Sequence, residues 1–124
     1  FDEMLQGMRD HLASLPRSLP LRDALRIAIV VFNHIPDGEL QYHRERMTLL
    51  LTVPSLVAHS TIRYASWRQV IADFAGERLG ASAGSLVPQT IAWVCLGVSI
   101  AAYEQWLADA ATQTTCRTAR RAAT

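Results

Sequence analysis

The sequence predicts an all-α domain: a bundle of about five helices, followed by a weak helix in the C-terminal tail. Three observations lead to this prediction. Prolines and glycines divide the chain into segments in which apolar residues recur every three or four positions. The sequence contains no polar–apolar alternation with a period of two over the length of a strand. At 124 residues, the chain has the size of one domain with its own core.

Proline positions define the first two helices. The segment 1–15 carries an apolar stripe and ends at Pro16, because proline interrupts helices. Pro20 suits the first turn of a second helix, which is expected to run to Ile35, before the turn sequence PDG. The apolar arc of this second helix is wider than one face, so it should make contacts on more than one side.

The third and fourth helices meet at Pro54. The third is expected over 39–53, and Pro54 can open the fourth, with Thr52 or Val53 near its N-cap. The fourth helix is long. It should end at Leu79, because the following Gly80 can adopt the left-handed conformation that terminates helices.

The fifth helix lies in a run of 25 residues without charge, from Leu79 to Tyr103. Ser85 is expected to cap it, with Pro88 in its first turn, where no backbone donor is lost. A membrane span, a core helix and a helix buried on two sides are the three interpretations. A span needs about 20 contiguous apolar residues, but only Ile91–Tyr103 is strongly apolar. A one-sided core helix would show a charged stripe, which the run lacks, so burial on two sides is favoured.

Charge and cysteine content limit the possible partners and the cellular location. The net charge of +1 gives no field that would recruit nucleic acid, and all twelve basic residues are arginines. Cys95 and Cys116 fit no disulfide or metal spacing, which favours a reduced cytoplasmic protein. The chain starts at Phe1 inside a helical pattern, so we expect it to be part of a longer protein.

Motifs for catalysis and metal binding are missing from the sequence. The four histidines form no metal signature, and Glu39 with His43 supplies only two potential ligands. The sequence offers no set of nucleophile, base and orienting group, and no glycine-rich phosphate loop. We therefore expect no catalytic residue, no metal and no cofactor.

Three stretches carry a resemblance to a known family. They are LRDALRIAIVVF (21–32), RERMTLLLTVPSLVAHSTIRYASWRQVIADFAGERLG (44–80) and CLGVSIAAYEQWLAD (95–109). Together they resemble the C-terminal domain of TetR-family transcriptional regulators, with actinobacterial members the most similar. The resemblance covers roughly 1–110. Such regulators bind operator DNA through an N-terminal helix-turn-helix, while the C-terminal domain dimerises and holds a small-molecule inducer.

The resemblance implies how this chain is organised. Its five helices would be the family's fourth to eighth, so operator DNA would be bound only by an N-terminal domain that this chain does not contain. The family's eighth and ninth helices usually form a four-helix bundle with their copies in a partner subunit. Here the tail TQTTCRTARRAAT after Ala111 departs from the pattern, because it is poor in apolar residues. The segment 111–124 is accordingly expected to be disordered or a weak helix.

A hydrophobic small-molecule effector is the predicted ligand, because large apolar side chains recur on the inward faces of the helices. Met adapts its shape to a ligand and Trp offers a flat contact area. A few polar groups on these faces would orient the ligand, although stripes of this kind also occur in ordinary cores. The candidate ligand-binding residues are Met4, Met8, Phe32, Met47, Arg63, Tyr64, Trp67, Ile71, Phe74, Thr90 and Trp93.

A homodimer is expected through the helix Thr90–Leu107, because its small residues let a second helix approach closely. The candidate interface residues are Val94, Gly97, Val98, Ala101 and Gln105. Three function classes follow. The first is the effector-sensing and dimerisation domain of a regulator, and the second is a helical homodimerisation module without a physiological ligand. The third, a small helical enzyme, would require a buried pair of acids or bases.

Overall fold

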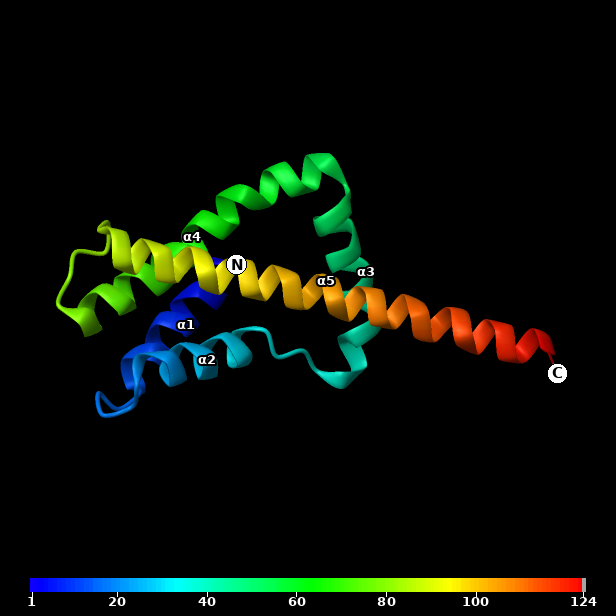
Figure 1. The fold of residues 1–124 in the computed structure, drawn as a ribbon, viewed down its shortest axis with the longest axis horizontal. Coiled ribbons are helices and arrows are strands. Elements are labelled where there is room, and N and C mark those ends of the chain that lie inside the picture. Colours follow the sequence, from blue (N-terminus) through cyan, green and yellow to red (C-terminus); the bar gives the residue numbers. More distant parts are fainter. Residues whose placement is uncertain (124) are drawn as a thin grey trace.

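The computed structural model describes residues 1–123, with the side chains of Thr114 and Thr115 left aside. The described chain is all-α, as the sequence predicts, and has no strand (Figure 1). Five helices and one short 3₁₀ turn follow one another along the chain: α1 (Asp2–Ser14), α2 (Leu21–Phe32), η1 (Asp37–Glu39), α3 (Leu40–Thr52), α4 (Pro54–Leu79) and α5 (Leu86–Ala123).

Most helix boundaries agree with the sequence predictions. Helix α1 ends two residues before Pro16, and Pro54 occupies the first turn of α4 with Val53 as its N-cap. Gly80 terminates α4 with φ 65°, a left-handed conformation that glycine adopts without a steric cost. Ser85 directly precedes α5, as predicted for its cap, and its carbonyl oxygen accepts from the Gln89 N–H at 3.1 Å, while its hydroxyl donates to the carbonyl oxygen of Ser82 at 2.5 Å.

Helix α2 is shorter than predicted, and ends at Phe32 instead of Ile35. Both the backbone N–H and the side-chain amide of Asn33 donate to the carbonyl oxygen of Ile29, at 3.1 and 2.9 Å. In addition, Pro36 disfavours a helical conformation for the residue before it. The chain therefore leaves the helix at Asn33 and brings this side chain to the end of α2.

Helix α5 differs most from the prediction. It has 38 residues and continues through the segment 111–123, so of the two expected alternatives, disorder or a weak helix, the structure has the helix, joined to α5 without a break. The physical reason is that neither glycine nor proline follows Gly97, while alanine, glutamine and arginine favour helix formation. The last turns of α5 extend beyond the other helices (Figure 1).

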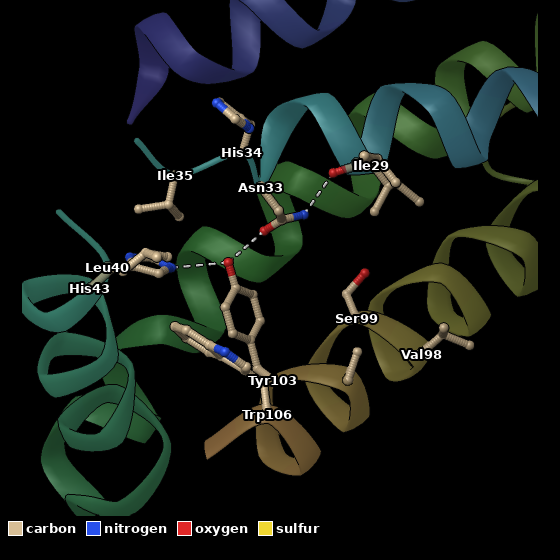
Figure 2. A pocket seen from close by; sticks show the side chains of 12 residues that line it. Ile29, Asn33, His34, Ile35, Leu40, His43, Val98, Ser99, Tyr103 and Trp106 are labelled. Atoms are coloured by element: carbon tan, nitrogen blue, oxygen red, sulfur yellow. Dashed lines mark hydrogen bonds between the residues drawn. The ribbon is translucent and has the colours of Figure 1, made fainter. Parts of the chain in front are cut away.

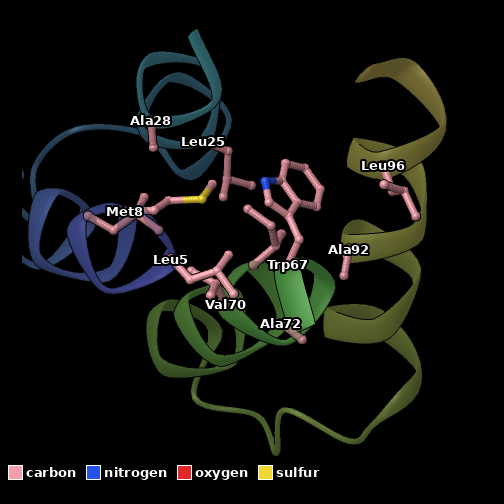
Figure 3. Close-up of a cluster of buried hydrophobic side chains, with 11 residues drawn as sticks. Leu5, Met8, Leu25, Ala28, Trp67, Val70, Ala72, Ala92 and Leu96 are labelled. Carbon is pink, nitrogen blue, oxygen red and sulfur yellow. The ribbon is translucent and has the colours of Figure 1, made fainter. Parts of the chain in front are cut away.

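The core lies where α1, α2, the C-terminal half of α4 and the first half of α5 meet (Figure 3). Within residues 1–123, helix α3 contributes no fully buried residue. The largest cluster of buried apolar side chains consists of Leu5, Met8, Leu12, Leu25, Ala28, Trp67, Val70, Ile71, Ala72, Ala92 and Leu96. Packing is therefore concentrated at one end of the domain.

Polar contacts reinforce this same end. The Arg78 guanidinium donates to three carbonyl oxygens of the loop between α1 and α2, those of Pro16, Arg17 and Leu19, at 2.8 to 3.3 Å. An ion pair of 2.8 Å joins Arg9 of α1 to Asp73 of α4. The C-terminal half of α4 thus holds both α1 and the loop that follows it.

Candidate ligand-binding site

Two neighbouring cavities lie at the other end of the domain, where α3 closes the bundle. The inner cavity, about 150 Å³, is lined by parts of all five α-helices. The outer pocket, about 500 Å³, opens between α2, α3 and α5 (Figure 2). Both are lined mainly by apolar side chains with a few polar groups, which is the usual make-up of a small-molecule site.

Six of the predicted ligand-binding residues line the inner cavity. They come from four different helices and lie far apart in the sequence, so the fold brings them together. They are Met4, Phe32, Met47, Arg63, Tyr64 and Trp67. Whether they bind a ligand remains a prediction.

The other five predicted residues lie elsewhere. Met8 and Ile71 belong to the packed core, and Phe74 lies under the Arg78 guanidinium, 4.9 Å from its ring centroid. Thr90 borders an open groove between α2 and α5. The assignment of Trp93 to an inward face is wrong, because this side chain is 56% exposed on the outer side of α5.

The helical phase explains the position of Trp93. Ala92 and Leu96 are the buried residues of this turn of α5, and Trp93 is rotated by one residue from Ala92, about 100° around the helix axis. The indole instead stacks with Arg68 of α4, whose guanidinium carbon lies 3.6 Å from the ring centroid. Cation–π packing of this kind does not require burial of the tryptophan.

Charge in the inner cavity is positive. Arg46 and Arg63 are the charged residues among those that line it, and the lining includes no acidic residue. The Arg63 guanidinium carbon lies 5.4 Å from the centroid of the Phe1 ring. Burial raises the pKa of the Tyr64 phenol, an effect that a hydrogen bond with Ser60 partly opposes.

Three polar side chains meet between the two cavities (Figure 2). The Tyr103 hydroxyl donates to Oδ1 of Asn33 at 2.9 Å, and Nε2 of His43 lies 3.1 Å from the same hydroxyl oxygen. Because a tyrosine hydroxyl carries a single hydrogen, His43 must be the donor in the second bond. The three side chains come from α5, the end of α2 and α3.

The environment fixes the protonation of this group. Burial, and secondly the charge of Arg46, lower the pKa of His43, which favours the neutral imidazole with its proton on Nε2. Burial raises the pKa of the Tyr103 phenol, so its hydroxyl keeps the proton that it donates. The arrangement is therefore a stable chain of hydrogen bonds at neutral pH.

The sequence analysis missed Tyr103 and Asn33, and considered His43 only as half of a metal pair. A signal for Tyr103 was present, because Leu96, Ile100 and Tyr103 follow one another at helical spacing on the inward side of α5. A tyrosine at the end of such a stripe has a polar tip that needs a partner. The identity of that partner could not be read from the sequence.

The predicted dimer residues all lie on one exposed side of α5. Val94 is 58% exposed and Val98 is 64% exposed, and Gly97, Ala101 and Gln105 are exposed as well. A methyl group added at Gly97 would have no neighbour within 4 Å in this chain. This face borders an apolar groove of about 570 Å³ between α2 and α5.

By length and composition alone, α5 could cross a membrane, and 17% of its most apolar window is buried within the described chain. Helix α5 is longer than the strongly apolar stretch Ile91–Tyr103 on which the sequence-based rejection of a span depends, because it begins at Leu86 and continues without a break to Ala123. A single helix of this kind is weak evidence for a membrane span, since core helices of soluble proteins have a similar length and composition, although those helices are mostly buried.

Metal ligands do not cluster in the part of the chain that the structure describes. Residues 1–123 contain no group of three or more histidine, cysteine, aspartate or glutamate side chains that could hold a metal ion. The polar residues of the two cavities are instead suited to hydrogen bonding with an organic molecule.

A helical bundle with an apolar cavity and an exposed apolar helix is compatible with a ligand-binding domain that forms dimers, and comparison with known proteins identifies the family. Residues 19–123 match the family described as the MftR C-terminal domain. The chain belongs to the TetR family of transcriptional regulators, as the C-terminal domain of such a protein.

One relative carries the name mycofactocin biosynthesis transcriptional regulator MftR, and comes from Mycobacterium tuberculosis. The two sequences are 46% identical over 105 residues, which is 85% of this chain and 52% of the relative. The chain thus spans about half the length of the regulator that it matches. Regulators of this family act as DNA-binding dimers.

Proposed function

We propose that this chain is the effector-sensing and dimerisation domain of a cytoplasmic transcriptional regulator. An apolar small molecule would bind in the inner cavity and control operator binding by a separate N-terminal DNA-binding domain. The observation that carries the proposal is the convergence of six predicted residues from four helices on one cavity. We propose no catalytic role, and the similarity to MftR makes genes of mycofactocin biosynthesis the first targets to examine.

Binding is tested through the emission of Trp67, which lines the inner cavity and is 5% exposed. The double variant Trp93→Phe/Trp106→Phe leaves Trp67 as the single tryptophan. Titration with an apolar probe such as Nile red should quench this emission, since the indole and the dye would be in contact. The matched control keeps Trp93 alone, which is exposed and should not respond. A response of Trp93 without one of Trp67 would place the ligand outside the cavity.

The second candidate is a homodimerisation module without a physiological ligand. The size of the inner cavity favours it, because about 150 Å³ is less than the roughly 300–1,000 Å³ of typical ligand pockets. Absence of binding for a panel of apolar compounds, together with a stable dimer, would support this candidate over the first.

The proposed dimer places the exposed side of α5 against its copy. Family membership favours a second subunit over a membrane as the cover of this apolar face. Ala101→Glu would bring two like charges close to the two-fold axis with little solvation, so we expect a monomer or an insoluble chain. Ala58→Glu, on an exposed position of α4, is the matched control. Sedimentation measures the oligomeric state of both variants, and a dimeric Ala101→Glu chain would contradict the proposed interface.

A further inference from the structure

The two cavities share a wall. Five residues line both of them: Asn33, Ile35, His43, Ser99 and Tyr103. Residues that border two cavities stand between them, so these side chains form a partition. Figure 2 shows the Tyr103 ring in this partition, with its hydroxyl between His43 and Asn33.

Hydrogen bonds hold the partition closed. Tyr103 donates to Asn33 and accepts from His43, and Asn33 in turn donates to the carbonyl oxygen of Ile29. A net contribution of about 0.5–1.5 kcal/mol per hydrogen bond is typical, so a ligand that offers equivalent partners can replace such bonds. The Tyr103 side chain is half-buried and belongs to a single helix. Rotation of this one side chain would therefore open the wall without unfolding any helix.

Size gives a reason for opening. The outer pocket, at about 500 Å³, falls within the range of typical ligand pockets by itself, whereas the inner cavity, at about 150 Å³, falls below it, so a ligand of typical size can contact Trp67 only if the two spaces are joined. A ligand in the outer pocket would pass the partition to reach Trp67, while on its other side the inner cavity borders Phe1 and Met4, which are 40% and 52% exposed.

We propose that Tyr103 is the gate between the two cavities and a specificity-determining residue of the effector site. This inference rests on the proposed ligand-binding function. When the gate opens, the ligand replaces Asn33 as acceptor for the Tyr103 hydroxyl. The ligand class is thus an apolar molecule that carries a carbonyl or another oxygen acceptor. The Arg46 charge beside the gate, with no carboxylate in the lining of the inner cavity, favours an acceptor at this position.

Opening of the gate would also change how α2 and α3 are attached to α5. His43 belongs to α3 and Asn33 ends α2, so loss of their bonds to Tyr103 weakens the attachment of both elements to α5, and the packing of Trp106 against His43 and Arg44 remains between α3 and α5. Occupation of the site would then shift α3 relative to α5, with α4 and its buried residues as the fixed frame.

The test compares two probes and two matched variants. Nile red has an apolar body and a carbonyl oxygen, whereas diphenylhexatriene is apolar without an acceptor. Tyr103→Phe removes one hydroxyl from the gate, and Tyr42→Phe removes one from α3, where Tyr42 is 71% exposed. Affinity and association rate are measured for each probe by fluorescence and stopped flow, after circular dichroism has shown that each variant is folded.

We expect two effects of Tyr103→Phe. Both probes should associate faster than with the wild-type chain, by about 2- to 10-fold, because the hydrogen bonds that close the partition are gone. The preference for Nile red over diphenylhexatriene should fall by a similar factor, because the carbonyl loses its donor. Tyr42→Phe should change neither quantity. Asn33→Ala provides a second variant: it should also speed association, but the preference should remain, because the hydroxyl is still present.

Failure of the gate and failure of the proposed function are distinguishable. If the wild-type chain binds neither probe, the proposed ligand-binding function is wrong, and the gate with it. If the wild-type chain binds both and Tyr103→Phe leaves rates and preference unchanged, the gate is wrong while ligand binding stands. Faster association in Asn33→Ala supports the gate even if Tyr103→Phe does not fold, and unchanged association in Asn33→Ala overturns it.

Discussion

The two halves of α4 differ in how many of their residues are buried. Between Trp67 and Gly76 the helix contributes six buried residues, whereas its half before Trp67 contributes only Ser60. The C-terminal half packs on α1 and α5, and bears the contacts of Arg78 and Asp73 (Figures 1 and 3). The N-terminal half and α3 border the cavities instead.

This difference separates stability from binding within one domain. Regions with many buried contacts open only with the whole protein, whereas regions with few buried contacts can change locally at low cost. We therefore expect the packed end to determine the free energy of unfolding, and the cavity end to tolerate substitution and to respond to ligands.

The largest contrast should come from apolar truncation at the two ends. Ile71→Ala at the packed end should lower the free energy of unfolding by about 2–5 kcal/mol, because Ile71 is 0% exposed and a cavity would remain. Met47→Ala, at a half-buried position of α3, should cost about 1 kcal/mol or less. Urea denaturation of both variants measures this. Equal losses would show that the two ends are equally packed.

Replacement of Arg78 should have the next largest effect. Arg78→Gln removes charge-assisted hydrogen bonds to the loop after α1, so we expect a loss of about 1.5–3 kcal/mol. Arg63→Gln, at the cavity end, is the control, and should stay within about 0.5 kcal/mol. Thermal denaturation of the two variants provides the comparison, and the assignment fails if Arg63→Gln is the more destabilising change.

A backbone substitution at the end of α4 should cost less. Gly80→Ala forces a side chain into a left-handed conformation with φ 65°, which should destabilise the fold by about 1 kcal/mol. Gly38→Ala in η1 has no positive φ and no neighbour within 4 Å of the added methyl, so it should be close to neutral. Chemical denaturation of the pair is sufficient, and a neutral Gly80→Ala would contradict the role of this residue in ending α4.

The smallest expected effect is a pH dependence at the cavity end. The pKa of His43 is lowered in the folded chain, so the unfolded chain binds the proton more tightly. The resulting stability is fully present above about pH 6.5, the usual histidine value, and is lost as the pH falls below it. His43→Gln should reduce the loss of melting temperature between neutral and mildly acidic pH. If this variant kept the pH profile of the wild-type chain, His43 would not be the source of the pH dependence.

The sequence predicts the helices well because their ends depend on local chemistry. Pro54 opens α4 and Gly80 closes it for reasons that involve only neighbouring backbone atoms. The inward side of α4 was also predictable, since Trp67 and Ile71 occupy one face at helical spacing. The continuous α5 is harder to predict, because the segment after Ala111 lacks the apolar residues that mark a packed helix, although it contains no helix breaker.

The candidate site was less predictable, because it depends on distant segments. Asn33, His43 and Tyr103 meet only in the folded chain, and each has an ordinary alternative as a surface residue. Trp93 was misplaced for a related reason: in an uncharged helix, no charged stripe marks the outer side. Patterns of apolar residues therefore predicted the packed end better than the cavity end.

Because α5 continues as one helix far beyond Tyr103, a small change in its direction there becomes a larger displacement at its C-terminal end. About 30 Å of helix separates Tyr103 from Ala123, at about 1.5 Å per residue. If the half of α5 before Tyr103 stays packed in the core, a bend of about 5° at Tyr103 would move the far end by roughly 2.6 Å, whereas the side chains around Tyr103 would move very little. A rearrangement too small to detect at the cavity would be magnified at the tip of α5, so a distance probe attached at Arg121 would report it more sensitively than one placed beside the ligand.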